Sequence, residues 1–250
     1  MAEDLIHRYA TAEDVAKAVA DAFVAFTTAC IKQTETCVVA ISGGTTPNAL
    51  FELLNTEEYR KKVDWENIYF LWVDERFVPH SDPDNNFHRA KERLFGNLGC
   101  SCHFYPVPTN NGTVEEAAAA YEKEVRTVLN ACEKTELDLV LLGLGDDGHT
   151  ASLFPKSSVL QEQDHIVVAV KDGKVWNRVT MTFPLLTSAK HVWFTVVGDS
   201  KAAALARVFR QRRDYADESW QDRIGRVLPG AVLTQDTVEW FVDEAASAGN

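Results

Sequence analysis

The segment that most constrains the fold of this chain runs from residue 139 to residue 155 and reads LVLLGLGDDGHTASLFP. It changes abruptly from an apolar run to a loop of glycines, acids and one histidine. The segment from Leu137 to Leu142 is short, mostly apolar and ends at Gly143, which is typical of a strand buried on both faces. Ligands of open α/β sheets bind beyond the carboxyl ends of such strands. The loop is therefore the first place to search for chemistry.

His149 is the candidate general base of this loop. Asp146 and Asp147 precede it closely, and Gly148 permits a tight turn or the close approach of a ligand. An imidazole titrates near neutrality, and a neighbouring carboxylate can fix its tautomer, so the pattern suits proton transfer. The alternatives are a structural histidine and a residue that caps a helix.

The same glycines also allow another interpretation of the loop. Gly143, Gly145 and Gly148 match the pattern G-x-G-x-x-G of dinucleotide-binding proteins, and they follow a predicted strand. However, the two acids between them would meet the pyrophosphate, and no acid ends a following strand to hold a ribose. Dinucleotide binding is therefore the weaker interpretation.

A second candidate loop follows the apolar run Cys37–Ile41. It reads SGGTTP from Ser42 to Pro47, and Pro47 is predicted as the first residue of a helix that includes Ala49 to Leu54. The order of strand, glycine loop and helix start is typical of an anion site, because free backbone N–H groups and the positive end of the helix dipole face one point. A tight turn with a helix cap explains the motif equally well.

The apolar run from Ile68 to Val73 continues directly into Asp74, Glu75 and Arg76. Arg76 suits a phosphate ligand that an acid holds in place, and a structural salt bridge is the alternative. The loop of residues 77–87 is rich in Pro, Asp and Asn, so it can either close over a ligand or remain solvated. Asn86 is predicted to cap a helix from Phe87 to Phe95.

Periodicity and capping patterns predict the remaining elements. Strands are expected at Leu5–Tyr9, His165–Val170, Arg178–Phe183, Val192–Val197 and Val238–Val242, and helices from Thr11 to Gln33, from Thr113 to Cys132, at Pro184–Ser188 and at Ala202–Phe209. Lys201 starts the last of these helices after Gly198-Asp199-Ser200. If the strands are parallel, the loops after them meet at one edge of the sheet. No repeat, linker or boundary divides residues 1–250, so we expect a single domain.

Composition excludes several classes of function. A formal net charge of −12 and a pI near 5.0 argue against a nucleic-acid-binding surface. The five cysteines lack disulfide or zinc-site spacing, since Cys100-x-Cys102 with His103 has no second ligand pair, so we expect reduced thiols. The N-terminal residues do not resemble a signal peptide, and no apolar run is long enough to span a bilayer. We therefore expect a cytoplasmic protein with no nucleic-acid or membrane partner.

Three blocks of the sequence resemble the 6-phosphogluconolactonase family, whose superfamily includes glucosamine-6-phosphate deaminase. They are SGGTTP at residues 42–47, DERFVP at residues 74–79 with Asn85-Asn86 downstream, and GLGDDGHTASLFP at residues 143–155. Two later blocks also resemble the family: RVTMT at residues 178–182, which begins at Arg178, and GDSK at residues 198–201, which ends at Lys201. The pair Asn85-Asn86 departs mildly from the Ser-Asn of the family.

The resemblance implies a Rossmann-like α/β fold with a mainly parallel central sheet and helices on both faces. It implies hydrolysis of 6-phospho-D-glucono-1,5-lactone to 6-phosphogluconate in the oxidative pentose phosphate pathway, without metal, cofactor or covalent intermediate. By position, His149 would be the base, Asp147 would orient it, and the phosphate and sugar would be held by Gly43, Gly44, Thr45, Arg76, Arg178 and Lys201. We expect a phosphorylated sugar lactone as the only partner of a monomer, with a weak homodimer as the alternative.

Two other enzymatic interpretations are weaker. One is covalent catalysis with Ser152, which lies near His149, as the nucleophile. However, no G-x-S-x-G elbow surrounds this serine, and residues 151–153 are expected to enter a helix. The other is a glucosamine-6-phosphate deaminase. The corresponding block of that enzyme resembles GHIAFNEP, whereas this chain has GHTASLFP, so the glutamate of that pattern is absent. A catalytically silent phosphosugar sensor is a further alternative, and it would bind 6-phosphogluconate without hydrolysing the lactone.

Overall fold

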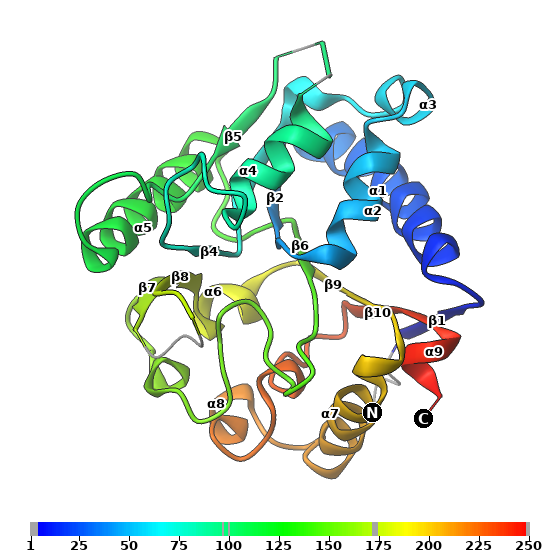
Figure 1. The fold of residues 1–250 in the computed structure, drawn as a ribbon, viewed down its shortest axis with the longest axis vertical. Helices are drawn as coiled ribbons and strands as arrows, with labels where there is room; N and C mark the ends of the chain where they lie inside the picture. The colour runs from blue at the N-terminus through cyan, green and yellow to red at the C-terminus, as the bar shows by residue number, and fades with distance from the viewer. Residues whose placement is uncertain (1–4, 97, 100, 172–174, 249–250) are drawn as a thin grey trace.

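A seven-stranded sheet forms the centre of the protein (Figure 1). The structure is a computed structural model that describes residues 5–96, 98–99, 101–171 and 175–248. All neighbouring strands of the sheet pair in parallel, which confirms the predicted architecture. In order across the sheet, the strands are β1 (Leu5–Tyr9), β10 (Val238–Asp243), β9 (His191–Val196), β6 (Leu139–Leu142), β2 (Cys37–Ile41), β3 (Ile68–Trp72) and β5 (His103–Tyr105).

Helices follow most of the strands, and the two longest begin at the predicted capping boxes. Thr11 and Asp14 cap the first, and Thr113 and Glu116 cap the other, each through reciprocal bonds between side chain and backbone. The α-helices are α1 (Ala12–Thr34), α2 (Thr45–Leu54), α3 (Glu57–Arg60), α4 (Asn86–Ala90, continued by a π-helical turn at Lys91–Phe95), α5 (Val114–Ala131), α6 (Phe183–Ser188), α7 (Ala202–Asp214), α8 (Trp220–Arg223) and α9 (Glu244–Ser247).

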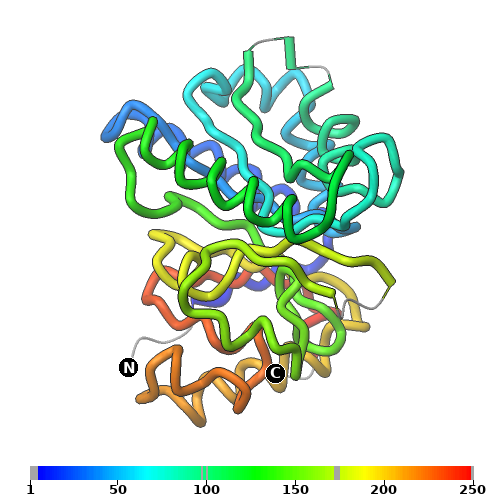
Figure 2. The backbone as a smooth tube through the Cα atoms, turned by 90° about the vertical axis from the view of Figure 1, so that its left-hand side faces the viewer, coloured from blue at the N-terminus to red at the C-terminus, as the bar shows by residue number. Residues whose placement is uncertain are grey.

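Alternation along the strands shows that helices cover both faces of the sheet. Phe26 of α1 packs edge-on against Trp193 of β9, with 5.6 Å between ring centroids. Phe194, the next residue of β9, stacks instead on Trp240 of β10, which Phe209 of α7 contacts. Because consecutive strand residues point to opposite faces, α1 and α7 lie on opposite sides of the sheet. In the side view, the segment from α3 to β5 and the segment of α7 and α8 lie at opposite ends of the molecule (Figure 2).

A small antiparallel sheet lies beside the parallel one and was not predicted. It consists of β7 (Val167–Val170), β8 (Arg178–Met181) and β4 (Asp74–Arg76), with β8 in the centre. The two sheets are joined at Val73, whose N–H donates to Ile41 of β2 and whose carbonyl accepts from Met181 of β8. The charged residues after β3 are thus a strand of their own, which pairs with β8 about one hundred residues later.

Two predicted helix starts were wrong by one or two residues. Helix α2 begins at Thr45 with Gly44 as its N-cap, so Pro47 is its third residue. A proline is tolerated throughout the first turn, where backbone N–H groups have no partner within the helix, so it does not mark the first residue uniquely. Asn85 caps α4 by accepting a backbone N–H of the first turn, whereas Asn86 is already helical.

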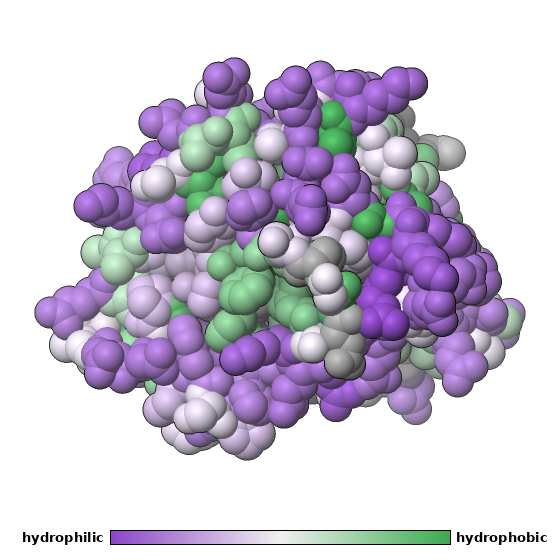
Figure 3. Space-filling model, turned by 90° about the horizontal axis from the view of Figure 1, so that it is seen from above, coloured by the Kyte–Doolittle hydropathy of each residue, from purple (hydrophilic) through white to green (hydrophobic). Residues whose placement is uncertain are grey.

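The surface seen from above is largely hydrophilic, with apolar side chains showing in several small patches (Figure 3). Large apolar side chains that are exposed are few among the described residues, and Phe104 on the edge strand β5 is one of them. No helix in the described part of the chain is both long and apolar enough to cross a bilayer. Cys30, Cys37 and Cys132 are free thiols, and Cys100 lies outside the described residues.

Candidate functional site

The loops that follow four adjacent strands meet at the carboxyl edge of the parallel sheet. Strands β9, β6, β2 and β3 are neighbours in that order, so the loops that were predicted to converge do so. The chain continues from β2 to β3 on one side and from β6 to β9 on the other. The chain therefore changes direction across the sheet between the neighbouring strands β2 and β6. Such a topological switch point is where ligands of open α/β sheets bind.

A polar pocket of about 280 Å³ opens at this switch point. Seven of the eight predicted site residues line it, namely Gly43, Gly44, Thr45, Arg76, His149, Arg178 and Lys201. The eighth, Asp147, contacts the ring of His149. The pocket thus brings the glycine loop, three cationic side chains and the candidate base together, which the sequence could only suggest from strand order.

His149 is held by its own loop. Its Nδ1 lies 2.5 Å from Oδ1 of Asp147, and the same oxygen accepts the backbone N–H of His149 at 3.1 Å. The imidazole also packs against Phe154, with 4.8 Å between ring centroids. An acceptor on Nδ1 fixes the tautomer that carries a proton there, so Nε2 is the nitrogen left to accept one. The geometry suits a general base.

Gly145 is required by the position of this ring. A Cβ atom at residue 145 would lie 2.0 Å from Nδ1 of His149, closer than non-bonded atoms can approach. The loop is closed by two backbone bonds, from Gly145 N–H to the carbonyl of His149 and from Gly148 N–H to the carbonyl of Gly145. Gly148 has a φ of +86°, which favours glycine. Gly145 and Gly148 therefore each have a structural role in the loop that carries the histidine.

The glycine loop before α2 presents the start of that helix to the pocket. Gly44 is the N-cap, with a φ of +112°, and no side chain caps the helix. Thr45 and Thr46 of the first turn line the pocket, where backbone N–H groups of a first turn suit an anion. Gly43 is packed against the side chain of Asn86, whose Oδ1 lies 2.0 Å from the place of a Cβ at residue 43.

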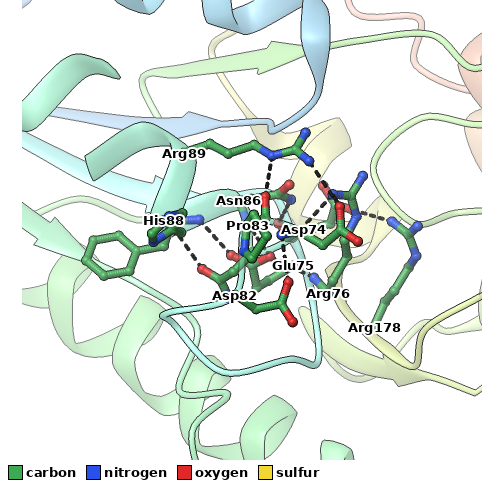
Figure 4. Close-up of polar contacts among 12 residues, drawn as sticks. Asp74, Glu75, Arg76, Asp82, Pro83, Asn86, His88, Arg89 and Arg178 are labelled. Carbon is green, nitrogen blue, oxygen red and sulfur yellow. Dashed lines mark hydrogen bonds and ion pairs between the residues drawn. The ribbon is translucent and has the colours of Figure 1, made fainter. Parts of the chain in front are cut away.

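Two arginines lie directly opposite each other on the antiparallel sheet. Arg76 of β4 and Arg178 of β8 are cross-strand partners, and both line the pocket. Like charges at such positions destabilise a sheet, so their placement here indicates a use for positive charge. Each has an acid at 3.6 Å, Asp84 for Arg76 and Asp74 for Arg178, and Figure 4 shows Arg178 directed toward Asp74 and Arg76. Lys201 completes the cations and lies 3.2 Å from Asp146.

Glu75 is the middle residue of β4, next to Arg76, and is fully buried. Its carboxylate accepts the backbone N–H groups of Arg76, Asn86 and Phe87, and it thereby joins β4 to the start of α4. Burial raises its pKa to about 8, although these three donors oppose the shift. These bonds go to backbone N–H groups and not to the pocket. The role of Glu75 is therefore to fix the backbone that carries Arg76.

The raised pKa of Glu75 predicts that stability falls as the pH rises. The unfolded chain releases this proton near the ordinary glutamate pKa, whereas the folded chain keeps it until about pH 8. Between these values the folded state binds more protons, so the free energy of unfolding decreases with pH and levels off above pH 8. The free energy of unfolding, measured with urea, should be lower at pH 8.5 than at pH 5.5. This decrease should be smaller in Glu75→Gln than in the wild type. An equal loss in both proteins would contradict this assignment.

Three further polar residues of the site were not among the predicted site residues, although the blocks DERFVP and Asn85-Asn86 contain two of them. Asp74, Asn86 and Ser152 are buried, and Asp74 and Asn86 also line the pocket. Ser152 was expected at a helix start, but it lies in a turn closed by a bridge between Thr150 and Leu153. Its hydroxyl donates to Asp74 at 2.5 Å, so it is not an exposed nucleophile.

One group of potential metal ligands occurs among the described residues, and it lies away from the pocket. Cys30, Cys37 and Asp138 bring their ligand atoms within 4.8 Å of one another at the amino-terminal edge of the sheet. The carboxylate of Asp138 already accepts from Lys134 at 2.9 Å and from Lys190 at 3.0 Å. Two ammonium groups disfavour a further cation there, so these residues suit a structural ion-pair network.

Comparisons with known proteins agree with this architecture. The family of glucosamine-6-phosphate isomerases/6-phosphogluconolactonase matches residues 10–238. The chain is 36% identical over 222 residues to a 6-phosphogluconolactonase of Nostoc sp., covering 87% of this chain and 86% of the relative. It is 39% identical over 180 residues to one of Synechocystis sp., covering 70% and 72%.

A 6-phosphogluconolactonase from Trypanosoma cruzi has the same fold. Its structure superposes with a TM-score of 0.81 at 24% identity and covers 99% of this chain and 97% of its own. The match of fold, the extent of the family match and the identity to curated relatives agree with one another. The chain belongs to the glucosamine-6-phosphate isomerase/6-phosphogluconolactonase family.

Proposed function

We propose that this protein hydrolyses 6-phospho-D-glucono-1,5-lactone to 6-phospho-D-gluconate, a step of the oxidative pentose phosphate pathway. The observation that carries the proposal is the pair of His149 and Asp147 at a pocket lined by Arg76, Arg178 and Lys201. A base beside a cluster of cations suits proton transfer on a phosphorylated substrate. The curated relatives named 6-phosphogluconolactonase support the same reaction and an enzyme of this type.

His149 acts as the base in the proposed mechanism. Its Nε2 takes a proton from water as the water oxygen attacks the lactone carbonyl carbon, and a tetrahedral intermediate forms. The imidazolium then returns the proton to the ring oxygen as the bond between that oxygen and the carbonyl carbon breaks. Asp147 holds the proton on Nδ1 and stabilises the imidazolium by its charge. The products are the free carboxylic acid and the hydroxyl released by ring opening.

The chemistry requires neither a covalent nucleophile nor a metal. A lactone is an activated ester, so positioning, one general base and donors for the oxyanion suffice. Ser152 is fully buried and its hydroxyl is bound to Asp74, which makes it unsuited to attack. The phosphate is held by the arginines, by Lys201 and by the start of α2 at Gly43, Gly44 and Thr45.

The decisive experiment measures loss of 6-phosphogluconolactone, generated in place from glucose 6-phosphate and corrected for spontaneous hydrolysis. We expect strong acceleration, and a much higher KM for glucono-1,5-lactone, which has no phosphate to meet the cations. Glucosamine 6-phosphate is the control substrate and should not be turned over. No acceleration over the background rate would remove the proposal. Binding of 6-phosphogluconate without turnover would instead indicate a sensor.

A further inference from the structure

Asp74 is a buried acid that faces the pocket, and the proposed reaction does not use it. It is 6% exposed and forms the first residue of β4. Its Oδ2 accepts the hydroxyl of Ser152 at 2.5 Å and lies 3.6 Å from Nη1 of Arg178. Arg178 in turn donates from Nη1 to the oxygen of Ser152, at 3.4 Å. The serine hydroxyl therefore lies within reach of both the carboxylate and the guanidinium.

In this arrangement Asp74 and Arg178 do not form a direct hydrogen-bonded ion pair. A direct bond between a guanidinium and a carboxylate is 2.7–2.9 Å long and often uses two parallel N–H groups. At 3.6 Å, Asp74 balances the charge of Arg178 without occupying its donors in that way. The donors that remain can then face a ligand in the pocket, which a closed fork would prevent.

The surroundings leave Arg178 few other supports. Its guanidinium lies 5.5 Å from the ring centroid of Phe154, and its Nε is buried without a hydrogen-bond partner. Arg76 lies directly opposite on β4 and repels it. Among the described residues, Asp74 and Ser152 are the polar side chains in contact with the Arg178 guanidinium.

Asp74 also connects the arginine to the rest of the pocket. Its backbone carbonyl accepts the side-chain amide of Asn86, which packs against Gly43 of the glycine loop. Ser152 follows His149 by three residues, and its backbone N–H donates to Thr180 of β8. One buried acid therefore contacts neighbours of the base, of the glycine loop and of the arginines.

We propose that Asp74, acting through Ser152, is a positioning residue that holds Arg178 ready for the anionic group of the substrate. The proposal rests on the proposed function for the identity of the ligand, 6-phosphogluconate or its lactone. Without the serine hydroxyl, Arg178 closes onto Asp74 and its donors are occupied. Without the carboxylate, the two arginines repel each other and Arg178 leaves the pocket. Both changes weaken binding of the phosphorylated ligand.

The test is a double-mutant cycle read by the Kd for 6-phosphogluconate, measured by calorimetry. Ser152→Ala and Asp74→Asn are each expected to raise Kd about tenfold, roughly the effect of losing one charge-assisted hydrogen bond. In an Arg178→Ala background, the same two changes should alter Kd less than twofold, because the group that they position is absent. Thr27→Val removes another buried hydroxyl, from α1 outside the pocket, and should leave Kd unchanged.

The outcomes separate this inference from the reaction. If the serine and aspartate variants weaken binding equally in both backgrounds, or not at all, they do not act through Arg178 and the inference is wrong. Lactone hydrolysis by the wild type is measured separately. Coupling in Kd without any hydrolysis would leave the positioning role intact and refute the lactonase reaction. Hydrolysis without coupling would support the lactonase reaction and refute the positioning role.

Discussion

We expect His149→Ala to lower kcat for 6-phosphogluconolactone by about 100-fold to 10,000-fold, the usual contribution of a positioned general base. The imidazole is the group whose tautomer is fixed by Asp147 at the pocket. The cations proposed to hold the phosphate are untouched by this change, so Kd for 6-phosphogluconate should rise no more than a few-fold. Initial rates at saturating lactone, corrected for spontaneous hydrolysis, measure the effect directly.

A matched control is available on the surface. His165 also pairs with an acid, Glu122 at 2.9 Å, but its side chain is exposed and does not line the pocket. His165→Ala should therefore retain wild-type kcat. If His149→Ala hydrolysed the lactone as fast as the control, another group would have to be the base. If it lost 6-phosphogluconate binding altogether, the loop itself would have collapsed and the rate would not report on proton transfer.

The parallel sheet could be predicted because its information is local. Each of its central strands is a short apolar run, and β2 and β6 are buried at every position. Capping boxes at Thr11 and Thr113 marked the long helices within a few residues. The antiparallel sheet could not be predicted in this way, because β4 is only three charged residues long and its partner is distant in sequence. Long-range pairing leaves no local pattern.

The site shows the same division between local and distant information. His149, Arg76 and Lys201 stand at abrupt changes from apolar to polar sequence, so they could be recognised as candidates. Ser152 could not, because a serine beside alanine and leucine gives no sign that it is buried against an acid 78 residues earlier. Likewise, the opposition of Arg76 and Arg178 depends on the register between β4 and β8, which only the structure supplies. The predicted chemical roles of these residues await the experiments described above.

Gly145→Ala should reduce kcat nearly as much as the loss of the histidine itself. The new Cβ would lie 2.0 Å from Nδ1 and 2.2 Å from Cε1 of His149, so the ring must move or the loop must open. Either movement breaks the bond to Asp147, and a displacement of about 1 Å at a reacting group costs on the order of 100-fold in rate. The residues proposed to bind the phosphate lie on other loops, so binding of 6-phosphogluconate should persist. Steady-state kinetics and calorimetry on the same preparation test both parts.

Gly143→Ala provides the comparison within the same loop. A Cβ at Gly143 would meet no atom within 4 Å, and the backbone there is not in the left-handed region, so His149 should stay in place. The methyl group does enter the pocket, so KM can change, but kcat should remain within a few-fold of wild type. If both glycine variants lost kcat equally, the loop would be sensitive to any added bulk. If Gly145→Ala alone lost it, the close packing of imidazole on glycine would be what fixes the base, and the G-x-G-x-x-G pattern would be explained without a dinucleotide.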